Sequence, residues 1–330
     1  MSEIKVGIVG LGFMGRTHLA SYRAAGARVV AVLDPTGGIA NGGNLGTGGE
    51  AVDLAGVEVY RDADSFFAKA NVNAVSVCTP TDTHVAIAER ALARGWHVLV
   101  EKPVALASAE IRRLESVAVA SGKVCVPAMV MRFWPGWTWL RDRVRDQQFG
   151  SLKTLTLERL GSRPTWNPAF YADAAKSGGA MVDLHIHDAD FVYWCFGRPD
   201  SLATTGSAEQ VTTIYRVGSG AGGPSVVASG GWAQQSSFGF RMRYLANFER
   251  ATVEFDLARG ESPVTISDAD GTRPVDVGTM NGYEAQVRHF LAVIAGRETP
   301  RATLADAAVV ADILALERKS LESRGCGRWA

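Results

Sequence analysis

Apolar and polar positions follow two different patterns along the chain. In the first part, short runs rich in β-branched residues alternate with segments whose apolar positions recur at helical spacing. The strand-like runs lie at residues 4–10, 28–34, 74–80, 97–103 and 124–130, and the helical segments at 17–26, 84–95 and 108–122. Strict alternation of strand and helix predicts a doubly wound α/β domain, in which helices cover both faces of a parallel sheet.

The pattern changes after about residue 150, where strand-like runs follow one another with only turn signals between them. These runs lie at 152–160, 201–207, 211–217, 225–232, 238–248, 251–257 and 264–271. Consecutive strands without intervening helices predict a large, mostly antiparallel open sheet. Two helical segments, 283–296 and 304–323, close the chain. We therefore expect an α/β domain over residues 1–128 and an α+β domain over 129–330.

One segment interrupts the alternation of strand and helix. Residues 37–49 contain seven glycines in thirteen positions, where a helix is expected after the second strand. Glycine loses more backbone freedom on ordering than any other residue. The composition therefore predicts a mobile loop at this point.

Composition narrows the classes of protein to consider. Lys plus Arg and Asp plus Glu number 34 each in 330 residues, so no net charge is available to attract nucleic acid or an anionic membrane surface. The four cysteines are far apart, and no apolar run reaches the length of a membrane span. We expect a cytoplasmic protein of two globular domains with neither nucleic-acid nor membrane partners.

A glycine turn follows the first strand directly and opens the first helix. Its residues are Gly10, Leu11, Gly12, Phe13, Met14 and Gly15, which match the pattern GxGxxG of dinucleotide-binding Rossmann domains. In that setting the first glycine makes the tight turn, the second lets a pyrophosphate approach the backbone, and the third allows close helix packing. The alternative is a tight turn without a ligand, but the strand and helix on either side favour a cofactor site.

Asp34 ends the second strand, at the position where this fingerprint has an acid that binds the adenosine ribose. Its carboxylate would repel the 2′-phosphate of NADP. No Lys or Arg occurs between Asp34 and Arg61 to compensate that repulsion, although amides of the glycine-rich segment could still bind a phosphate. We expect NAD, with NADP less favoured.

Residues 179–190, GAMVDLHIHDAD, contain two histidines and three aspartates. If residues 182–196 form a helix, then Asp183, His187 and Asp190 lie at i, i+4 and i+7 and share one face. A carboxylate one turn before a histidine can fix its tautomer and stabilise its cation, as a general base requires. This arrangement indicates a proton-transferring pair, Asp183 and His187.

Two other interpretations of this stretch remain open. Asp, His and Asp on one helical face could bind a divalent metal, but no fourth ligand is evident in the sequence, so we expect none. Alternatively, Asp183 merely complements the positive start of its helix and His187 packs. On such a helix His185 and Asp188 point elsewhere, and we expect them to be structural or solvated.

Three motifs complete the pattern: CTPTDTH at 78–84, EKP at 101–103 and GGAMVDLHIHDAD at 178–190. Together with the glycine turn they resemble the Gfo/Idh/MocA family, over almost the whole chain and in the same order. The resemblance implies a Rossmann domain followed by a domain whose large sheet often forms the subunit contact. It also implies that Lys102, Asp183 and His187 flank the nicotinamide.

The same resemblance extends to the cofactor pocket. It implies that Thr79, Pro80 and His84 line this pocket, that Glu101 lies beside the nicotinamide ribose, and that the bond between Lys102 and Pro103 is cis. The glycine-rich segment departs from the family, whose members usually continue there as a helix. Most lysines are solvated surface charges, but Lys102 ends a strand of an α/β sheet, where ligands bind, and could stabilise alkoxide charge.

These observations lead to a hypothesis for the activity. We expect an NAD-dependent dehydrogenase of a cyclic polyol or sugar, of the inositol, aldose or anhydrosugar type, with Arg132 and Trp166 as candidate substrate contacts. A dinucleotide-binding regulator without turnover and an NAD-dependent glycoside hydrolase are the alternatives. The second domain's sheet, with helices on one face, predicts a homo-dimer or homo-tetramer.

Overall fold

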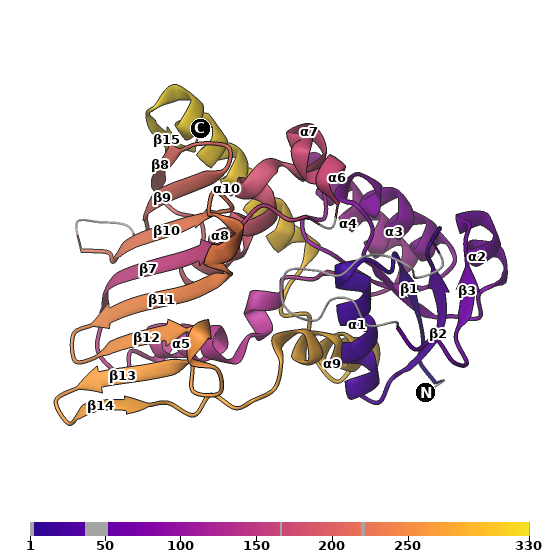
Figure 1. Ribbon diagram of the computed structural model, residues 1–330, viewed down its shortest axis with the longest axis horizontal. Coiled ribbons are helices and arrows are strands. Elements are labelled where there is room, and N and C mark those ends of the chain that lie inside the picture. Colours follow the sequence, from indigo (N-terminus) through magenta and orange to yellow (C-terminus); the bar gives the residue numbers. More distant parts are fainter. Residues whose placement is uncertain (1–2, 37–51, 166, 219–221, 330) are drawn as a thin grey trace. The chain divides into compact units, whose positions relative to one another are not determined.

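The structure is a computed structural model that describes residues 3–36, 52–165, 167–218 and 222–329. The chain forms two compact units, each built around one sheet (Figure 1). The first unit comprises residues 1–130, 164–170 and 281–308, and the second comprises 131–163, 171–280 and 309–330. Residues 37–49, where the sequence predicts a loop, lie outside the described residues.

The first unit is a six-stranded parallel sheet with strand order β3-β2-β1-β4-β5-β6, which is the order of a Rossmann fold. Its strands are β1 (Lys5–Val9), β2 (Arg28–Leu33), β3 (Glu58–Tyr60), β4 (Ala74–Val77), β5 (His97–Val100) and β6 (Cys125–Pro127). Its helices include α1 (Phe13–Ala24), α2 (Ala63–Lys69), α3 (His84–Ala93), α4 (Ser108–Ser121) and α9 (Gly282–Ile294). The predicted doubly wound fold is confirmed.

A single apolar cluster explains why α9, far along the chain, belongs to the first unit. Val287 and Phe290 of α9 are fully buried in the cluster that also holds Leu19 and Tyr22 of α1 and Ile8 of β1. The guanidinium of Arg288 also donates to the carbonyl of Ala24, at the end of α1 (2.8 Å). The compact units therefore divide the chain differently from the expected domains 1–128 and 129–330.

The second unit is a nine-stranded sheet with order β14-β13-β12-β11-β7-β10-β9-β8-β15. Its strands are β7 (Leu152–Leu160), β8 (Ser201–Gly206), β9 (Gln210–Arg216), β10 (Ser225–Gly231), β11 (Arg241–Phe248), β12 (Thr252–Asp256), β13 (Val264–Asp268), β14 (Gly271–Pro274) and β15 (Cys326–Arg328). Among the described strands of this sheet, only β7 and β10 pair in parallel. The predicted mostly antiparallel sheet is confirmed.

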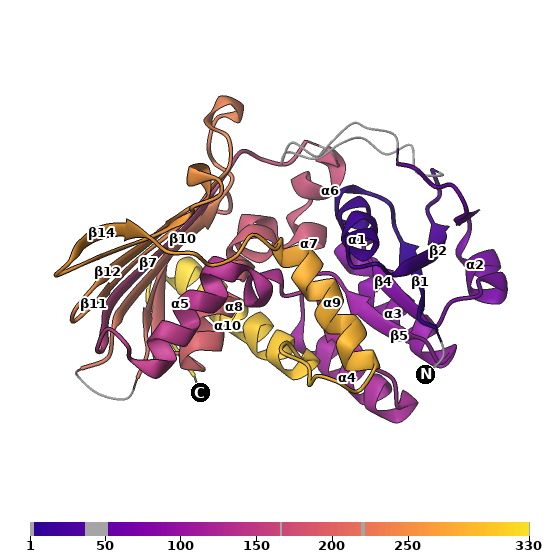
Figure 2. The same ribbon diagram turned by 90° about the horizontal axis from the view of Figure 1, so that it is seen from below.

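Alternation of burial shows which face of this sheet is covered. Met242, Tyr244 and Ala246 of β11 are buried, whereas Leu245 between them is 41% exposed. Figure 2 shows α5 (Pro135–Asp146), α8 (Ile186–Phe196) and α10 (Leu304–Ser323) on one side of the sheet. Period-two burial therefore places an apolar face under helices and leaves a second, more polar face.

The spacing of Asp183 and His187 predicts one α-helix over residues 182–196. The structure instead divides this segment into two helical parts. A π-helical turn, Met181–His185, precedes α8. His185 packs directly on β10, where a Cβ added to Gly230 would lie 2.9 Å from the imidazole Nδ1. The wider turn buries His185 against the sheet, and such turns are common at functional sites. No described helix is long and apolar enough to cross a bilayer.

Candidate active site

Four strands of the first unit's parallel sheet end at one edge, and a motif follows each of them. The glycine turn follows β1, Asp34 follows β2, residues 78–84 follow β4, and EKP follows β5. Backbone hydrogen bonds join adjacent strand ends: Gly10 N to Leu33 O (2.8 Å), Cys78 N to Val9 O (2.8 Å) and Glu101 N to Val77 O (2.9 Å). Ligands of open α/β sheets bind at this edge, beyond the carboxyl ends of the strands.

The three glycines of the turn have different local environments. Gly10 has φ of +87°, which favours glycine, and a Cβ on Gly15 would lie 1.9 Å from the carbonyl oxygen of Gly10. A Cβ on Gly12 would meet no described atom within 4 Å. Gly12 is also the N-cap of α1, and no described side chain caps this end. The turn therefore leaves space and backbone amides where a phosphate group would fit.

Phe13 and Met14 begin α1 and are half-buried. The Asp34 side chain is largely buried, and hydrogen bonds hold it against the glycine turn. Its Oδ2 accepts the N–H of Leu11 (2.7 Å), and its Oδ1 accepts the N–H of Thr36 (2.8 Å). These bonds fix the carboxylate beside the glycine turn, where the sequence predicts contact with the adenosine ribose.

His84 links two of the motifs within the first unit. Its Nδ1 lies 2.9 Å from the carbonyl of Pro103 and its Nε2 lies 2.7 Å from the carbonyl of Thr79, and burial lowers its pKa. Thr79 is half-buried, and Pro80 is exposed. The imidazole thus ties the loop after β4 to the EKP turn, and its contact with a cofactor stays a prediction.

Glu101 and Lys102 follow β5 and differ in exposure. Glu101 is buried, and its carboxylate contacts the imidazole of His18 (2.9 Å) and accepts the N–H of Lys102 (3.1 Å). Lys102 is half-buried. The peptide bond between Lys102 and Pro103 is cis, which confirms the expectation. A contact of Glu101 with the nicotinamide ribose stays a prediction.

In the second unit, Asp183 lies in the π turn and His187 in the first turn of α8, and both are half-buried. Two successive glycines with positive φ, Gly178 (+75°) and Gly179 (+71°), lead the chain into the turn. A Cβ on Gly178 would come within 2.4 Å of the Val182 side chain. Glycine at this position is therefore required by both φ and packing.

The other three polar residues of this stretch are buried and paired. Asp188 binds the Arg159 guanidinium (2.9 Å), and Asp190 binds that of Arg132 (2.7 Å). His185 Nε2 lies 3.1 Å from the Glu317 carboxylate. Of the two expectations for His185 and Asp188, the structural one is confirmed and the solvated one is wrong. These pairs anchor the π turn and α8, and within residues 179–190 Asp183 and His187 are the more accessible polar residues.

Of the two candidate substrate residues, Arg132 and Trp166, the structure describes only Arg132. Arg132 is 2% exposed, and its guanidinium clasps Asp190 through Nε (3.1 Å to each oxygen) and Nη2 (2.7 Å). This geometry gives Arg132 a structural role, and its contact with substrate stays a prediction. Trp166 lies outside the described residues. No group of three or more His, Cys, Asp and Glu side chains that could hold a metal ion occurs within the described part of the chain.

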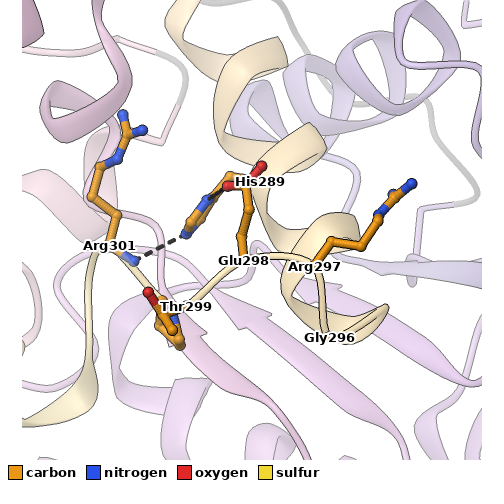
Figure 3. Close-up of a pocket in the computed structure, with 7 residues that line it drawn as sticks. His289, Gly296, Arg297, Glu298, Thr299 and Arg301 are labelled. Atoms are coloured by element: carbon orange, nitrogen blue, oxygen red, sulfur yellow. Dashed lines mark hydrogen bonds and ion pairs between the residues drawn. The ribbon is translucent and has the colours of Figure 1, made fainter.

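A pocket of the first unit lies apart from the motifs in sequence (Figure 3). It is lined by His289 of α9 and by residues 296–301 of the loop that follows. His289 Nδ1 contacts the Glu298 carboxylate (2.5 Å), and its Nε2 accepts the N–H of Arg301 (3.0 Å). The imidazole therefore fastens this loop to α9.

A buried polar cluster next to the EKP turn was not predicted from the sequence. It consists of His18, Tyr22, Ser76, Cys78 and Glu101, of which only Glu101 belongs to a predicted site. The signal in the sequence was a histidine one helical turn before a tyrosine on the inner face of α1. A single histidine on an apolar helix face does not reveal its partner on another strand.

Comparisons with known proteins agree with this geometry. A sequence model described as an oxidoreductase family with an NAD-binding Rossmann fold matches residues 4–129, and one described as the GFO/IDH/MocA C-terminal domain matches residues 137–224. The inositol 2-dehydrogenase of Rhizobium meliloti (strain 1021) is 28% identical in an alignment of length 315 that covers 88% of this chain and 88% of that protein.

Two further relatives broaden the comparison. The solved structure of UDP-N-acetylglucosamine 3-dehydrogenase from Acidithiobacillus ferrooxidans has a TM-score of 0.78 at 22% identity and covers 98% of this chain and 99% of that one. The 2,7-anhydro-N-acetylneuraminate hydratase of Mediterraneibacter gnavus is 29% identical over 62% of this chain and 53% of that protein. Both family models match, one in each expected domain, and the protein belongs to the Gfo/Idh/MocA family of NAD-binding oxidoreductases.

Proposed function

We propose that the protein is an NAD-dependent dehydrogenase that oxidises a hydroxyl group of a cyclic polyol or sugar. The observation that carries this proposal is the sheet edge of the first unit, where the glycine turn, Asp34 and the EKP turn follow β1, β2 and β5 of one parallel sheet. An uncapped helix start, an anchored acid and a lysine at one edge are the parts that a dinucleotide site requires. The inositol 2-dehydrogenase and UDP-N-acetylglucosamine 3-dehydrogenase relatives support the substrate class.

The proposal assigns NAD rather than NADP to the site. The residues that would hold it are Gly10, Gly12 and Gly15 at the pyrophosphate and Asp34 at the adenosine ribose. Asp34 is held in place by the N–H of Leu11, so its negative charge cannot easily leave the position where a 2′-phosphate would come. Replacing Asp34 by Asn should narrow the preference for NAD over NADP.

The chemical roles are assigned to three side chains. A bound NAD would supply a nicotinamide able to take up the hydride of the substrate carbon. His187 takes the proton of the substrate hydroxyl on an imidazole nitrogen, and Asp183 orients and stabilises that imidazole. The Lys102 ammonium donates a hydrogen bond to the substrate oxygen and stabilises the negative charge that develops there.

Two alternatives make different predictions. In an NAD-dependent glycoside hydrolase the hydride leaves and later returns, so no reduced cofactor accumulates. One relative is named 2,7-anhydro-N-acetylneuraminate hydratase, a name that denotes addition of water rather than net oxidation. A dinucleotide-binding regulator would bind NAD without turnover. Such a regulator does not need Lys102, Asp183 and His187 together, and their joint presence favours an enzyme.

We further propose a cytoplasmic homo-dimer or homo-tetramer that forms through the open face of the second unit's sheet. The free thiols of all four cysteines support the compartment. Strand register aligns Ile214, Val227, Thr156 and Leu245 in one row across β9, β10, β7 and β11. Ile214 is 54% exposed and Leu245 is 41% exposed, and a symmetric partner would cover this row. Ile214→Glu should lower the mass measured by light scattering.

The activity is tested with purified protein, NAD or NADP, and a panel of inositols, aldoses, anhydrosugars and acyclic polyols. Growth of reduced-cofactor absorbance with NAD and one cyclic compound supports the dehydrogenase. A new sugar product without accumulation of reduced cofactor would support the hydrolase. Calorimetric binding of NAD without any turnover would support the regulator.

A further inference from the structure

Behind the EKP turn lies a buried cluster that the proposed chemistry does not use. His18 comes from α1, Ser76 from β4, and Glu101 from the turn after β5. His18 and Ser76 are 0% exposed, and Glu101 is 5% exposed. Three separate segments of the first unit therefore place ionisable and polar groups together in its interior, where each must have a partner.

The imidazole of His18 is held at both nitrogens. Its Nε2 lies 2.9 Å from Oε1 of Glu101, and its Nδ1 lies 3.1 Å from Oγ of Ser76. The hydroxyl of Tyr22, one turn further along α1, lies 2.9 Å from the same Ser76 oxygen. The two contacts of the imidazole itself hold the ring with Nε2 facing Glu101.

The charge state of the ring matches its contacts. Burial alone would lower the pKa of His18, but Cys78 and Glu101 outweigh burial and raise the pKa to about 10. Burial raises the pKa of the Cys78 thiol, and the adjacent His18 imidazole partly offsets that rise. An imidazolium has two N–H donors, one for each of its two neighbours.

Glu101 connects this ring to the lysine of EKP. Its Oε1 faces His18, and its Oε2 accepts the backbone N–H of Lys102 (3.1 Å). The carboxylate therefore joins a buried cation on one side to the Lys102 main chain on the other. If the cation were removed, the buried carboxylate would lose its compensation and would protonate or turn toward water.

We propose that His18 is a positioning residue for Lys102 and acts through the carboxylate of Glu101. His18 sets the direction of the Glu101 side chain, and Glu101 holds the backbone from which the Lys102 side chain extends. The inference rests on the proposed role of Lys102 as the group that stabilises the substrate oxygen. It adds a residue from α1 to the support of the active site.

Substitution of His18 by Asn or by Gln tests its contacts with Ser76 and with Glu101 separately. The amide of Asn lies near the position of Nδ1 and can still reach Ser76, whereas the longer Gln reaches the position of Nε2 and can still donate to Glu101. His18→Asn should lower kcat by about 10²-fold, the size of effect expected from a small displacement of a catalytic group. His18→Gln should restore about tenfold or more of this loss. In both variants NAD affinity, measured by calorimetry, should fall by a smaller factor than kcat, because the glycine turn and Asp34 are unaffected.

Two control variants test whether a general loss of stability causes the effect. Tyr22→Phe removes another buried hydrogen bond of the same cluster but leaves the contact between His18 and Glu101 intact. His289→Asn breaks a different histidine–glutamate contact of the same unit, the one shown in Figure 3. Both should keep wild-type kcat. Equal losses in Tyr22→Phe and His18→Asn would overturn the proposal.

A second readout does not depend on turnover. Pro103 has no amide hydrogen, so hydrogen exchange in a short peptide that ends at this residue reports on the N–H of Lys102. Exchange there should be faster in His18→Asn than in wild type and nearly normal in His18→Gln. Unchanged exchange in His18→Asn would overturn the proposal even if no substrate had been found.

Lys102→Met, assayed beside these variants, tests the role of Lys102 separately from the positioning role of His18. If Lys102→Met is inactive while His18→Asn keeps wild-type kcat, then the positioning role is wrong and the proposed function stands. If Lys102→Met keeps wild-type kcat, then the role of Lys102 is wrong, and the inference built on it falls as well. Loss of kcat in Lys102→Met and His18→Asn, with recovery in His18→Gln, supports both.

Discussion

Each unit contains a buried histidine–glutamate pair next to a segment with proposed catalytic residues. In the first unit His18 and Glu101 are 2.9 Å apart, and Glu101 precedes Lys102. In the second unit His185 and Glu317 are 3.1 Å apart, and His185 lies between Asp183 and His187 in sequence. In the first unit the acid of the pair, Glu101, is next to a proposed catalytic residue in sequence. In the second unit it is the histidine of the pair, His185, that is close in sequence to the proposed catalytic residues.

The pairs also differ in how well their hydrogen bonds are satisfied. Both nitrogens of His18 have partners. His185 Nε2 is close to Glu317 and to the Tyr215 hydroxyl (3.2 Å), but among the described residues its Nδ1 has no hydrogen-bond partner. Burial lowers the pKa of His185, yet Glu317 outweighs burial and the net shift is upward. The second pair is therefore the more costly one, because a protonated Nδ1 would be a buried donor without an acceptor.

The largest expected effect concerns His187, the proposed proton acceptor, which lies two residues after the supporting His185. His187→Ala should lower kcat by about 10²–10⁴-fold, the contribution of a positioned proton-transfer group. NAD affinity should change little, because the glycine turn and Asp34 are unaffected. Steady-state kinetics beside calorimetry gives both numbers. Wild-type turnover in this variant would remove His187 from the mechanism.

The next effect concerns stability in the second unit. Glu317→Ala leaves His185 and Tyr215 without their buried carboxylate, and removal of one partner of a buried ion pair costs about 3–5 kcal/mol. Glu298→Ala is the matched control, because its carboxylate is half exposed and such pairs contribute about 0–1 kcal/mol. The free energies of unfolding come from urea titrations. Equal losses in the two variants would show that burial does not distinguish these pairs.

A smaller effect tests the packing that supports the π turn. Gly230→Ala would bring a methyl group within 2.9 Å of the His185 ring, and overpacking of this kind costs about 1–3 kcal/mol. The turn can yield only by moving the segment that holds Asp183 and His187, so kcat should fall together with stability. Gly222→Ala is the control, since a Cβ there meets no described atom within 4 Å. A stable Gly230→Ala variant with normal kcat would contradict this account.

The smallest expected effect is a dependence of stability on pH in the first unit. The pKa of His18 is raised from 6.5 to about 10, so its protonated ring stabilises the fold fully below pH 6.5. That contribution is lost as the pH rises through about 10. The difference in unfolding free energy between wild type and His18→Gln should therefore narrow as the pH rises from 6.5 to about 10. Parallel pH profiles of the two proteins would contradict the shift.

The sequence predicted the parts of the fold whose signal is local. Strand and helix periodicity gave the doubly wound sheet, and the strand-like runs after residue 150 gave the large, mostly antiparallel sheet. The GxGxxG pattern located a turn whose Gly10 and Gly15 the structure shows to be sterically required. These features depend on neighbouring residues or on short repeats, which a sequence displays directly.

Features that depend on distant partners were not predictable in the same way. The α9 helix joins the first unit because Val287 and Phe290 pack beside α1, more than 250 residues earlier in the chain. The position of His185 in the π turn depends on the absence of a side chain at Gly230 of strand β10. His18 and Glu101 are 83 positions apart, so neither identifies the other before the sheet is assembled.

The most direct test of the proposed activity follows a labelled hydride. The protein is incubated with NAD and a cyclic polyol that carries deuterium on its hydroxyl-bearing carbons, and the reduced cofactor and the recovered sugar are analysed by mass spectrometry. The dehydrogenase proposal predicts deuterium in reduced nicotinamide that accumulates in wild type and is strongly diminished in His187→Ala. Deuterium found only in a released sugar product, or no transfer to a cofactor that calorimetry shows to be bound, would contradict it.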